Sequence, residues 1–146
     1  MIRARAADLA RLEPLVAAFH HHMGIAQDAQ TRRAALQPLL DECPHGRVYL
    51  AGARHDPAGY AIICFGWSVE MGGRESFVDE LYVRPAHRGQ GVGGALLAHS
   101  AQELRKMGVM ALHLELDRSD ARTRRLYERA GFDPRARYML MTRRLT

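Results

Sequence analysis

Lysine, cysteine and long apolar runs are all scarce in this sequence. Lys106 is the single lysine, so 20 of the 21 basic residues are arginine. Two cysteines, Cys43 and Cys64, are too few for a disulfide framework, and we expect both to be small buried apolar residues in a reducing compartment. No apolar run approaches the ~20 residues of a membrane span, and the charged N-terminal segment lacks the apolar stretch of a secretory signal. These absences predict a cytoplasmic protein without a membrane partner.

Length and composition are those of one globular domain. The chain has 146 residues, of which 47% are apolar and 25% charged, and both fractions are average for a folded protein. A chain of this length buries roughly 68–70% of its unfolded surface, which is enough for a core of its own. No internal repeat, low-complexity tract or linker interrupts it. We therefore expect a single domain over residues 1–146.

Positive charge is concentrated near the C-terminus. Residues 118–144 contain nine arginines and three acids, a local charge of +6, whereas the rest of the chain has twelve bases and thirteen acids. A basic segment of this kind indicates an anionic ligand or nucleic acid at one end, and a solvated helix face is the equally weighted structural alternative. Because the segment lacks the interleaved aromatics and the module of a nucleic-acid binder, we do not expect a nucleic-acid partner.

Hydrophobic periodicity predicts a mixed α/β fold with helices on both faces of one sheet. Asp8 is a plausible N-cap for the first helix, in which Pro14 either introduces a kink or delays the start to Glu13, and Pro38 raises the same question in the second. The predicted helices extend from the Asp8 cap to residue 23, over residues 28–40, from the glycine-rich loop at residues 88–94 to about residue 107, and over residues 121–130. The predicted strands cover residues 2–4, 47–51, 59–69, 77–83, 110–116 and 137–142.

A glycine-rich loop at residues 88–94 follows the predicted strand 77–83 and opens the helix that ends near residue 107. Glycines at 89, 91, 93 and 94 leave few β-carbons to block a ligand. The loop N–H groups and the positive helix end then form a cradle suited to phosphate. The loop is neither a Walker A motif, since no Gly-Lys-Ser/Thr follows, nor a good dinucleotide-binding match in its glycine spacing. The structural alternative is that the glycines only allow close packing of the helix.

Three motifs, in chain order, resemble the GNAT superfamily of N-acetyltransferases. Arg88-Gly89-Gln90-Gly91-Val92-Gly93 resembles the family's acyl-coenzyme A pyrophosphate loop, and residues 79–85 resemble the strand before it. Residues 126–132 resemble the family's Leu-Tyr-Glu-x-x-Gly-Phe segment. The resemblance covers nearly the whole chain and implies the GNAT fold, with a central mixed, mostly antiparallel sheet, and acetyl-CoA as the acetyl donor. One departure is Asp120, which stands where the family often has asparagine. This change preserves the helix cap but leaves a contact from that side chain to coenzyme A in question.

The resemblance also implies where coenzyme A binds. In the family a bulge near the end of the strand opens a gap to the neighbouring strand, and the pantetheine arm enters that gap as a pseudo-strand. Backbone groups of the strand would bind the arm, and one N–H would polarise the acetyl carbonyl as an oxyanion donor does. We expect Gly91 and Gly93 to need glycine because a β-carbon would intrude on the pyrophosphate. The expected binding residues are Leu81, Tyr82, Val83, Arg88, Gly89, Gln90, Gly91, Val92, Gly93, Gly94 and Asp120.

Two adjacent acids, Asp79 and Glu80, interrupt an otherwise apolar strand. Neighbouring strand residues face opposite sides of a sheet, and partial burial would raise the pKa of a carboxyl and suit it to general-base catalysis. We favour Glu80 as the base, directly or through a water. Asp79 is the alternative base or a binder of the amine cation. Pairing of either acid with an arginine such as Arg74 is the structural alternative.

Tyr127 is the candidate general acid. It follows Asp120 by seven residues, which puts both on one helix face, and the resemblance places that helix beside the thioester. A phenol is protonated at neutral pH and can donate to a departing thiolate. Arg124 and Arg125 could lower its pKa. Packing of the ring in the core is the alternative role.

The resulting prediction is an acetyltransferase that passes the acetyl group directly to a primary amine in a ternary complex. Neither cysteine lies in a nucleophile motif. We expect no metal site, because the consecutive residues His20, His21 and His22 fan around a helix. Phe65, Trp67 and Met71 are expected to pack in the core rather than shape an acceptor pocket. The acceptor, a small molecule or a protein amine, is open, as is a homodimer. A non-catalytic acyl-CoA-binding or sensor module is the alternative function.

Overall fold

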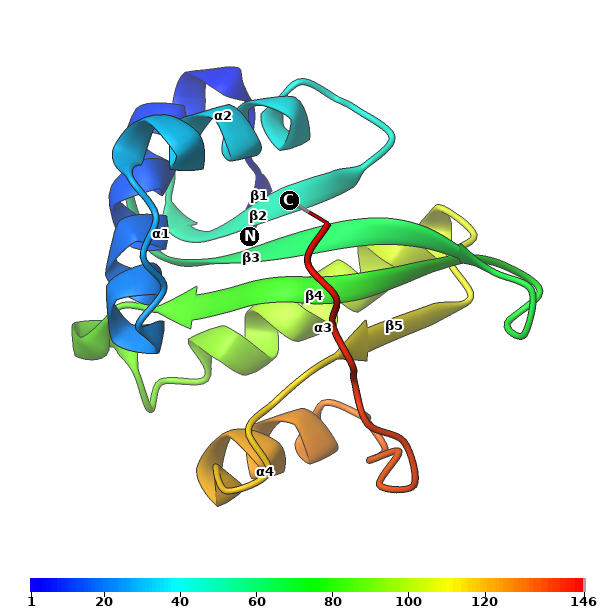
Figure 1. The fold of residues 1–146 in the computed structure, drawn as a ribbon. Coiled ribbons are helices and arrows are strands. Elements are labelled where there is room, and N and C mark those ends of the chain that lie inside the picture. Colours follow the sequence, from blue (N-terminus) through cyan, green and yellow to red (C-terminus); the bar gives the residue numbers. More distant parts are fainter. Residues whose placement is uncertain (146) are drawn as a thin grey trace.

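A five-stranded sheet with helices on both faces forms the protein in the computed structural model, which describes residues 1–145 (Figure 1). The strands lie in chain order across the sheet. Neighbours are antiparallel up to β4, and β5 runs parallel to β4 because α3 provides a crossover between them. The strands are β1 (Ile2–Arg3), β2 (Gly46–Ala53), β3 (Asp56–Ser68), β4 (Gly73–Val83) and β5 (Ala111–Leu114). The helices are α1 (Leu9–Met23), α2 (Ala29–Leu40), α3 (Val92–Lys106) and α4 (Ala121–Arg129), with 3-10 turns at Ala6–Asp8 and Pro85–His87. The predicted fold class is confirmed.

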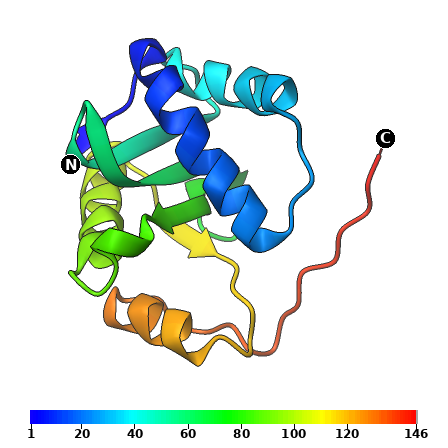
Figure 2. The same cartoon turned by 90° about the vertical axis from the view of Figure 1, so that its left-hand side faces the viewer.

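Two hydrophobic cores lie on opposite faces of the sheet. Val48 and Leu50 of β2 point into the core under α1 and α2, whereas Tyr49 and Ala51 point into the core under α3. All four side chains are almost fully buried, which is typical of a strand covered on both faces. Figure 2 shows α1 and α2 on one side of the sheet and α3 on the other. The central strands therefore carry both cores.

Neither proline breaks its helix. The α1 helix is continuous through Pro14 and α2 through Pro38, so the first helix does not start at Glu13. Asp8 precedes α1, but its side chain accepts the Arg5 N–H at 2.9 Å rather than capping the helix. Within residues 1–145, none of the helices has both the length and the apolar character needed to span a membrane.

The predicted strand at residues 137–142 is wrong. Within the described chain no strand follows α4, and the sheet ends at β5. Figure 2 shows the segment after α4 running away from the sheet, and Tyr138, Met139 and Met141 are 61–85% exposed. The apolar residues of this segment favour an extended chain, but a strand also needs a neighbour for its backbone hydrogen bonds, and none lies beside it.

Candidate active site

The last part of β4 is not paired with β5. The two strands pair only from Glu75 opposite Ala111 to Val78 opposite Leu114, whereas β4 continues to Val83. On its other side β4 contains a bulge, since Ile62 pairs with Glu80 and Ile63 with Val78, leaving Asp79 as the extra residue. A bulge bends its strand and increases the local twist. An open backbone edge therefore extends from Asp79 to Val83.

The hydrogen-bond alternation of β4 decides which backbone groups face this edge. The Arg84 N–H donates to the Ala58 carbonyl at 2.9 Å. In an antiparallel ladder every second residue bonds to the partner strand. Tyr82, opposite Tyr60, therefore bonds toward β3, while the N–H and C=O of Leu81 and Val83 face the open edge. Of the three predicted backbone positions, Leu81 and Val83 therefore face the open edge, although the Val83 carbonyl there accepts a hydrogen bond from Arg88 Nε at 2.9 Å.

Gly89 and Gly91 shape the loop after β4. Both have positive φ angles, +77° and +79°, and no heavy atom lies within 4 Å of the place where a β-carbon would stand. Gly91 is the N-cap residue before α3, and the first turn of α3 has no side-chain cap, so the N–H groups of that turn remain available to an anion. The loop therefore has open space at both glycines and lies at a positive helix end.

Gly93 and Gly94 are placed differently, in the first turn of α3. A β-carbon at Gly93 would lie 3.5 Å from Leu126 and 3.8 Å from Val83, and one at Gly94 would lie 3.9 Å from Leu126. These are ordinary contacts rather than clashes. The glycines of this turn therefore border the space between the end of β4 and α4.

The polar side chains of the loop are directed at its own backbone. Arg88 Nε donates to the Val83 carbonyl at 2.9 Å, and its guanidinium lies over the Tyr82 ring, 5.6 Å from the centroid. Gln90 Nε2 donates to the Ala86 carbonyl at 3.1 Å. Val92 packs against the α3-side core. These contacts hold the loop in place, whereas Gly89 and Gly91 leave open space beside it.

The expected helix cap at Asp120 is confirmed. Its Oδ1 accepts the Thr123 N–H at 2.9 Å, and the hydrogen bonds from Thr123 lower the pKa of the carboxyl. Tyr127 lies in the same helix, with its ring against Phe132 at a centroid distance of 5.9 Å. Burial raises the pKa of Tyr127, and the Asp120 charge raises it further.

The expectation that Arg124 and Arg125 lower the pKa of Tyr127 is wrong. Arg124 Nε donates to Glu128 at 2.8 Å, and Arg125 Nε donates to the Ala121 carbonyl at 3.2 Å. Each guanidinium group therefore bonds to a residue of its own helix, four positions away in the chain. The phenol hydroxyl consequently stays protonated to a higher pH than a free tyrosine.

Glu80 lies at the centre of a buried hydrogen-bond network. Its Oε1 is 2.6 Å from His20 Nε2, and its Oε2 accepts the Tyr60 hydroxyl at 2.6 Å. Tyr60 is fully buried and His20 is 7% exposed. Pairing of Glu80 with Arg74 is wrong, because that guanidinium stacks over the Phe65 ring at 5.3 Å. The partners of Glu80 come instead from α1 and β3.

Asp79 has a more open environment than Glu80. Asp79 is an exposed residue, yet partial desolvation raises the pKa of its carboxyl, and only a positively charged His20 would act in the opposite direction. Both acids raise the pKa of Tyr60 and Cys64, which lie beside the α1-side core. The strict alternation that would place the acids on opposite faces is broken by the bulge, so both act on the same groups.

Cys64 is a partly buried thiol near the acidic pair. Burial, with the Asp79 and Glu80 charges, raises its pKa to about 11. A thiol with so high a pKa carries little of the reactive thiolate at neutral pH. The structure therefore offers no activated cysteine nucleophile beside the two acids.

Sequence reasoning placed the histidine run that contains His20 near the acceptor site, but it missed the pairing of His20 with Glu80 and the whole role of Tyr60. His20 follows Val16 by four residues and Leu12 by eight, so it shares their buried helix face. Tyr60 occupies an interior position of β3 beside Glu80. The helical spacing of His20 was the available signal, because His21 and His22 fall on the exposed side. Within residues 1–145, no three His, Cys, Asp or Glu side chains are grouped so as to hold a metal ion.

The expectation of core packing holds for Phe65 but is wrong for Trp67. Phe65 packs against the α3-side core between Arg47 and Arg74. Trp67 is 74% exposed, because β3 there extends beyond the helices toward its turn with β4. Met71 lies in that turn, where its N–H donates to the Ser68 hydroxyl at 3.1 Å.

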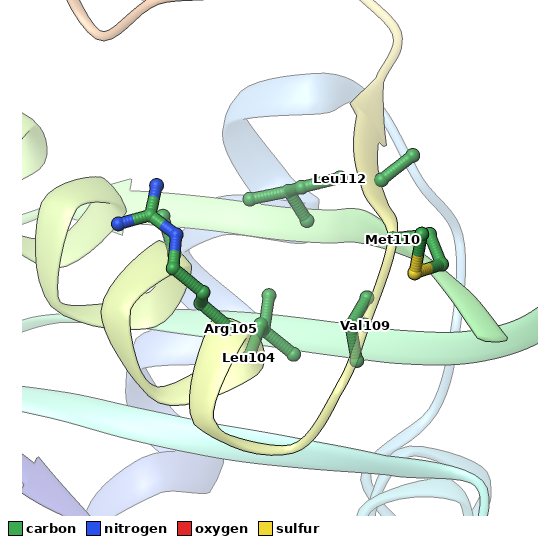
Figure 3. Close-up of a pocket in the computed structure, with 7 residues that line it drawn as sticks. Leu104, Arg105, Val109, Met110 and Leu112 are labelled. Carbon is green, nitrogen blue, oxygen red and sulfur yellow. The ribbon is translucent and has the colours of Figure 1, made fainter. Parts of the chain in front are cut away.

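Two hollows elsewhere in the surface lie apart from these residues. One, of about 150 Å³, lies between the end of α3 and the start of β5 (Figure 3). The other, of about 460 Å³, includes Arg47, Tyr49 and His99 in its lining. None of the predicted site residues lines either hollow.

Comparison with known proteins relates this chain to one family. The profile of the acetyltransferase (GNAT) family matches residues 15–132. The chain is 38% identical over 123 residues to a mycothiol acetyltransferase of Propionibacterium freudenreichii, covering 80% of this chain and 36% of that protein. It is 33% identical over 88 residues to the streptothricin acetyltransferase of Streptomyces lavendulae, covering 59% and 44%. The alignments thus span less than half the length of these relatives.

A shorter match and two solved structures complete the comparison. An Escherichia coli ribosomal protein bS18 alanine N-acetyltransferase is 42% identical over 59 residues, which are 40% of each chain. The integron cassette protein HFX_CASS3, from a salt-marsh metagenome, has a TM-score of 0.87 at 32% identity, covering 99% of this chain and 89% of its own. A protein from Arthrobacter sp. FB24 has a TM-score of 0.82 at 33% identity, covering 99% and 94%. The open edge of β4, the glycine loop and these matches agree, and the chain belongs to the GNAT family of acetyltransferases.

Proposed function

We propose that this protein transfers the acetyl group of acetyl-CoA to a primary amine. The observation that carries the proposal is the continuity of the open edge of β4 with the glycine loop and the uncapped first turn of α3. An extended pantetheine arm can bond to Leu81 and Val83 as an added strand does. The pyrophosphate then meets the N–H groups of the loop and helix end.

The chemistry proposed for this site is direct transfer in a ternary complex. The amine nitrogen forms a bond to the acetyl carbon, the bond from that carbon to sulfur breaks, and coenzyme A leaves as a thiolate. An N–H at the open edge of β4 stabilises the developing oxyanion. The acidic pair accepts the proton from the amine, and the Tyr127 hydroxyl protonates the thiolate. The high pKa of Cys64 argues against an acyl-cysteine intermediate.

The acceptor is proposed only as far as its chemical class. The relatives are named for acetylation of streptothricin, of mycothiol and of an alanine of a ribosomal protein. These names include both small molecules and a protein, so they do not single out one acceptor class. Two carboxylates, Asp79 and Glu80, favour a basic primary amine over a neutral or acidic acceptor.

A thiol-release assay with acetyl-CoA across a panel of amines tests this proposal. Small amines, polyamines, aminoglycosides and peptides with a free N-terminus would be compared, with mass spectrometry of the acceptor to confirm a gain of one acetyl group. Release of coenzyme A that depends on one class of amine supports the proposal. Tight calorimetric binding of acetyl-CoA without release for any amine would support the non-catalytic sensor instead.

A further inference from the structure

Both carboxylate oxygens of Glu80 are already occupied by donors. Tyr60 has a single hydroxyl proton, which it directs at Oε2 over 2.6 Å. His20 Nε2 lies 2.6 Å from Oε1, and a carboxylate can only accept. This geometry is satisfied by an ionised Glu80 and an Nε2–H on His20. The opposite arrangement, in which a protonated Glu80 donates to an unprotonated Nε2, would place the proton of a neutral ring on Nδ1.

The other ring nitrogen of His20 indicates which form the histidine takes. His20 Nδ1 is buried and has no hydrogen-bond partner among residues 1–145. An imidazolium would carry a charged N–H at that position without an acceptor, which is far more costly than an unpaired lone pair. The neutral Nε2–H form is therefore favoured, and it acts on Glu80 as a fixed donor.

Asp79 differs from Glu80 in both its exposure and its hydrogen bonding. It is the extra residue of the β4 bulge, its side chain is exposed, and no hydrogen bond to it is found within the described chain. The titratable groups facing it are His20 from α1, Tyr60 and Cys64 from β3, and Glu80 beside it. Burial raises its pKa. Asp79 can therefore take up a proton without giving up any existing bond.

We infer that Asp79, rather than Glu80, accepts the amine proton, and that His20 and Tyr60 are positioning residues that hold Glu80 as a permanent anion beside it. This inference rests on the proposed function. As the N–C bond forms, the amine proton passes to an Asp79 oxygen, and the electron pair of the broken C–S bond leaves on sulfur. Glu80 attracts the cationic amine into the site and keeps its own charge throughout.

The histidine form is tested without any activity. Long-range ¹H–¹⁵N correlation spectra distinguish the two neutral imidazole forms from the charged one. From the hydrogen-bond geometry we expect the Nε2–H form of His20, with its signals altered in Glu80→Gln. His21 and His22, both exposed, provide reference signals in the same spectrum. A charged His20, or one protonated on Nδ1, would refute the assignment of Glu80 as a fixed anion.

The proton acceptor is tested by the pH dependence of kcat, which reports groups in the ternary complex rather than the free amine. Asp79→Asn should lower kcat by about 10²–10⁴-fold and remove the acidic limb, as expected for loss of a general base. Asp79→Glu should restore the limb. Glu80→Gln should keep the limb and raise the KM for the amine. Loss of the limb in Glu80→Gln but not in Asp79→Asn would overturn the assignment.

Two further variants separate positioning from folding. His20→Gln should reproduce the KM effect of Glu80→Gln with no additional effect in the double variant, since both act through one carboxylate. His21→Gln, next in the chain but exposed, should behave as the wild type. Additive effects of the His20 and Glu80 variants would contradict the positioning role. If the wild type releases coenzyme A with no amine, the proposed function fails, while the spectra still decide the state of His20.

Discussion

Replacing Gly93 by alanine tests whether this glycine is needed for the packing of α3 or for the binding of acetyl-CoA. The backbone there is helical, and the new methyl would lie 3.5 Å from Leu126 and 3.8 Å from Val83, both ordinary contacts. The free protein should therefore tolerate it. Alanine exceeds glycine in helix propensity by roughly 0.8–1.0 kcal/mol in a helix interior. At the helix start we expect about half of that, which raises Tm by about 1–2 °C for a domain of this size.

The same methyl should weaken binding of acetyl-CoA. It projects into the space between Val83 and Leu126, where the open edge of β4 meets the glycine loop. We expect a loss of affinity of at least 10-fold, equivalent to about 1.4 kcal/mol. Calorimetric titration measures the affinity directly. Melting curves at a fixed excess of ligand should show the corresponding loss of ligand-induced stabilisation.

Gly91 and Gly108 provide a matched pair of controls. Both have positive φ, +79° and +71°, and open space around the position of a β-carbon, so alanine at either should cost a similar ~1–2 kcal/mol of backbone strain. Only Gly91 lies in the loop, so only Gly91→Ala should also weaken acetyl-CoA binding. Unchanged affinity in Gly93→Ala, or equal losses of affinity in the Gly91 and Gly108 variants, would refute the assignment of the loop as the ligand cradle.

Three further predictions concern single side chains around the site. Tyr127→Phe should lower kcat by about 10-fold or more with little change in acetyl-CoA affinity or Tm; because its pKa is raised, the wild type should show no alkaline limb from this group below pH ~10. Full activity of the variant would leave solvent as the acid. Asp120→Asn should keep the helix cap but bind acetyl-CoA more tightly and move the alkaline limb to lower pH, since one negative charge is removed. Folding lowers the pKa of Asp120, so the ionised Asp120 stabilises the protein above the pKa that it has in the unfolded chain, and this stabilisation is lost as pH falls. The difference in unfolding free energy between wild type and Asp120→Asn should therefore shrink in acid, and a difference that grew would contradict this. In a Cys43→Ser background, the rate of Cys64 alkylation should keep rising to about pH 11; a plateau near pH 8.5 would show an ordinary thiol.

The fold class and the glycine loop were predictable because local sequence determines them. The apolar period of a helix and the buried run of a central strand are properties of neighbouring residues. A glycine at positive φ is likewise a local requirement, as at Gly89 and Gly91. The Asp120 cap involves only residues three apart in the chain. For the same reason the short helix α4 was located to within one residue of its observed end.

Tertiary structure alone decided what surrounds the reacting groups. His20 and Glu80 are 60 positions apart and Tyr60 and Glu80 are 20 apart, so no local pattern joins them. The bulge at Asp79 depends on the register of β4 against β3, which overrides the alternation expected of a regular strand. The predicted strand at 137–142 had suitable side chains but no adjacent edge to pair with. Sequence by itself thus determined the elements and the loop, because these depend on residues close in the chain. The partners of each acid depend on which distant segments the fold brings together.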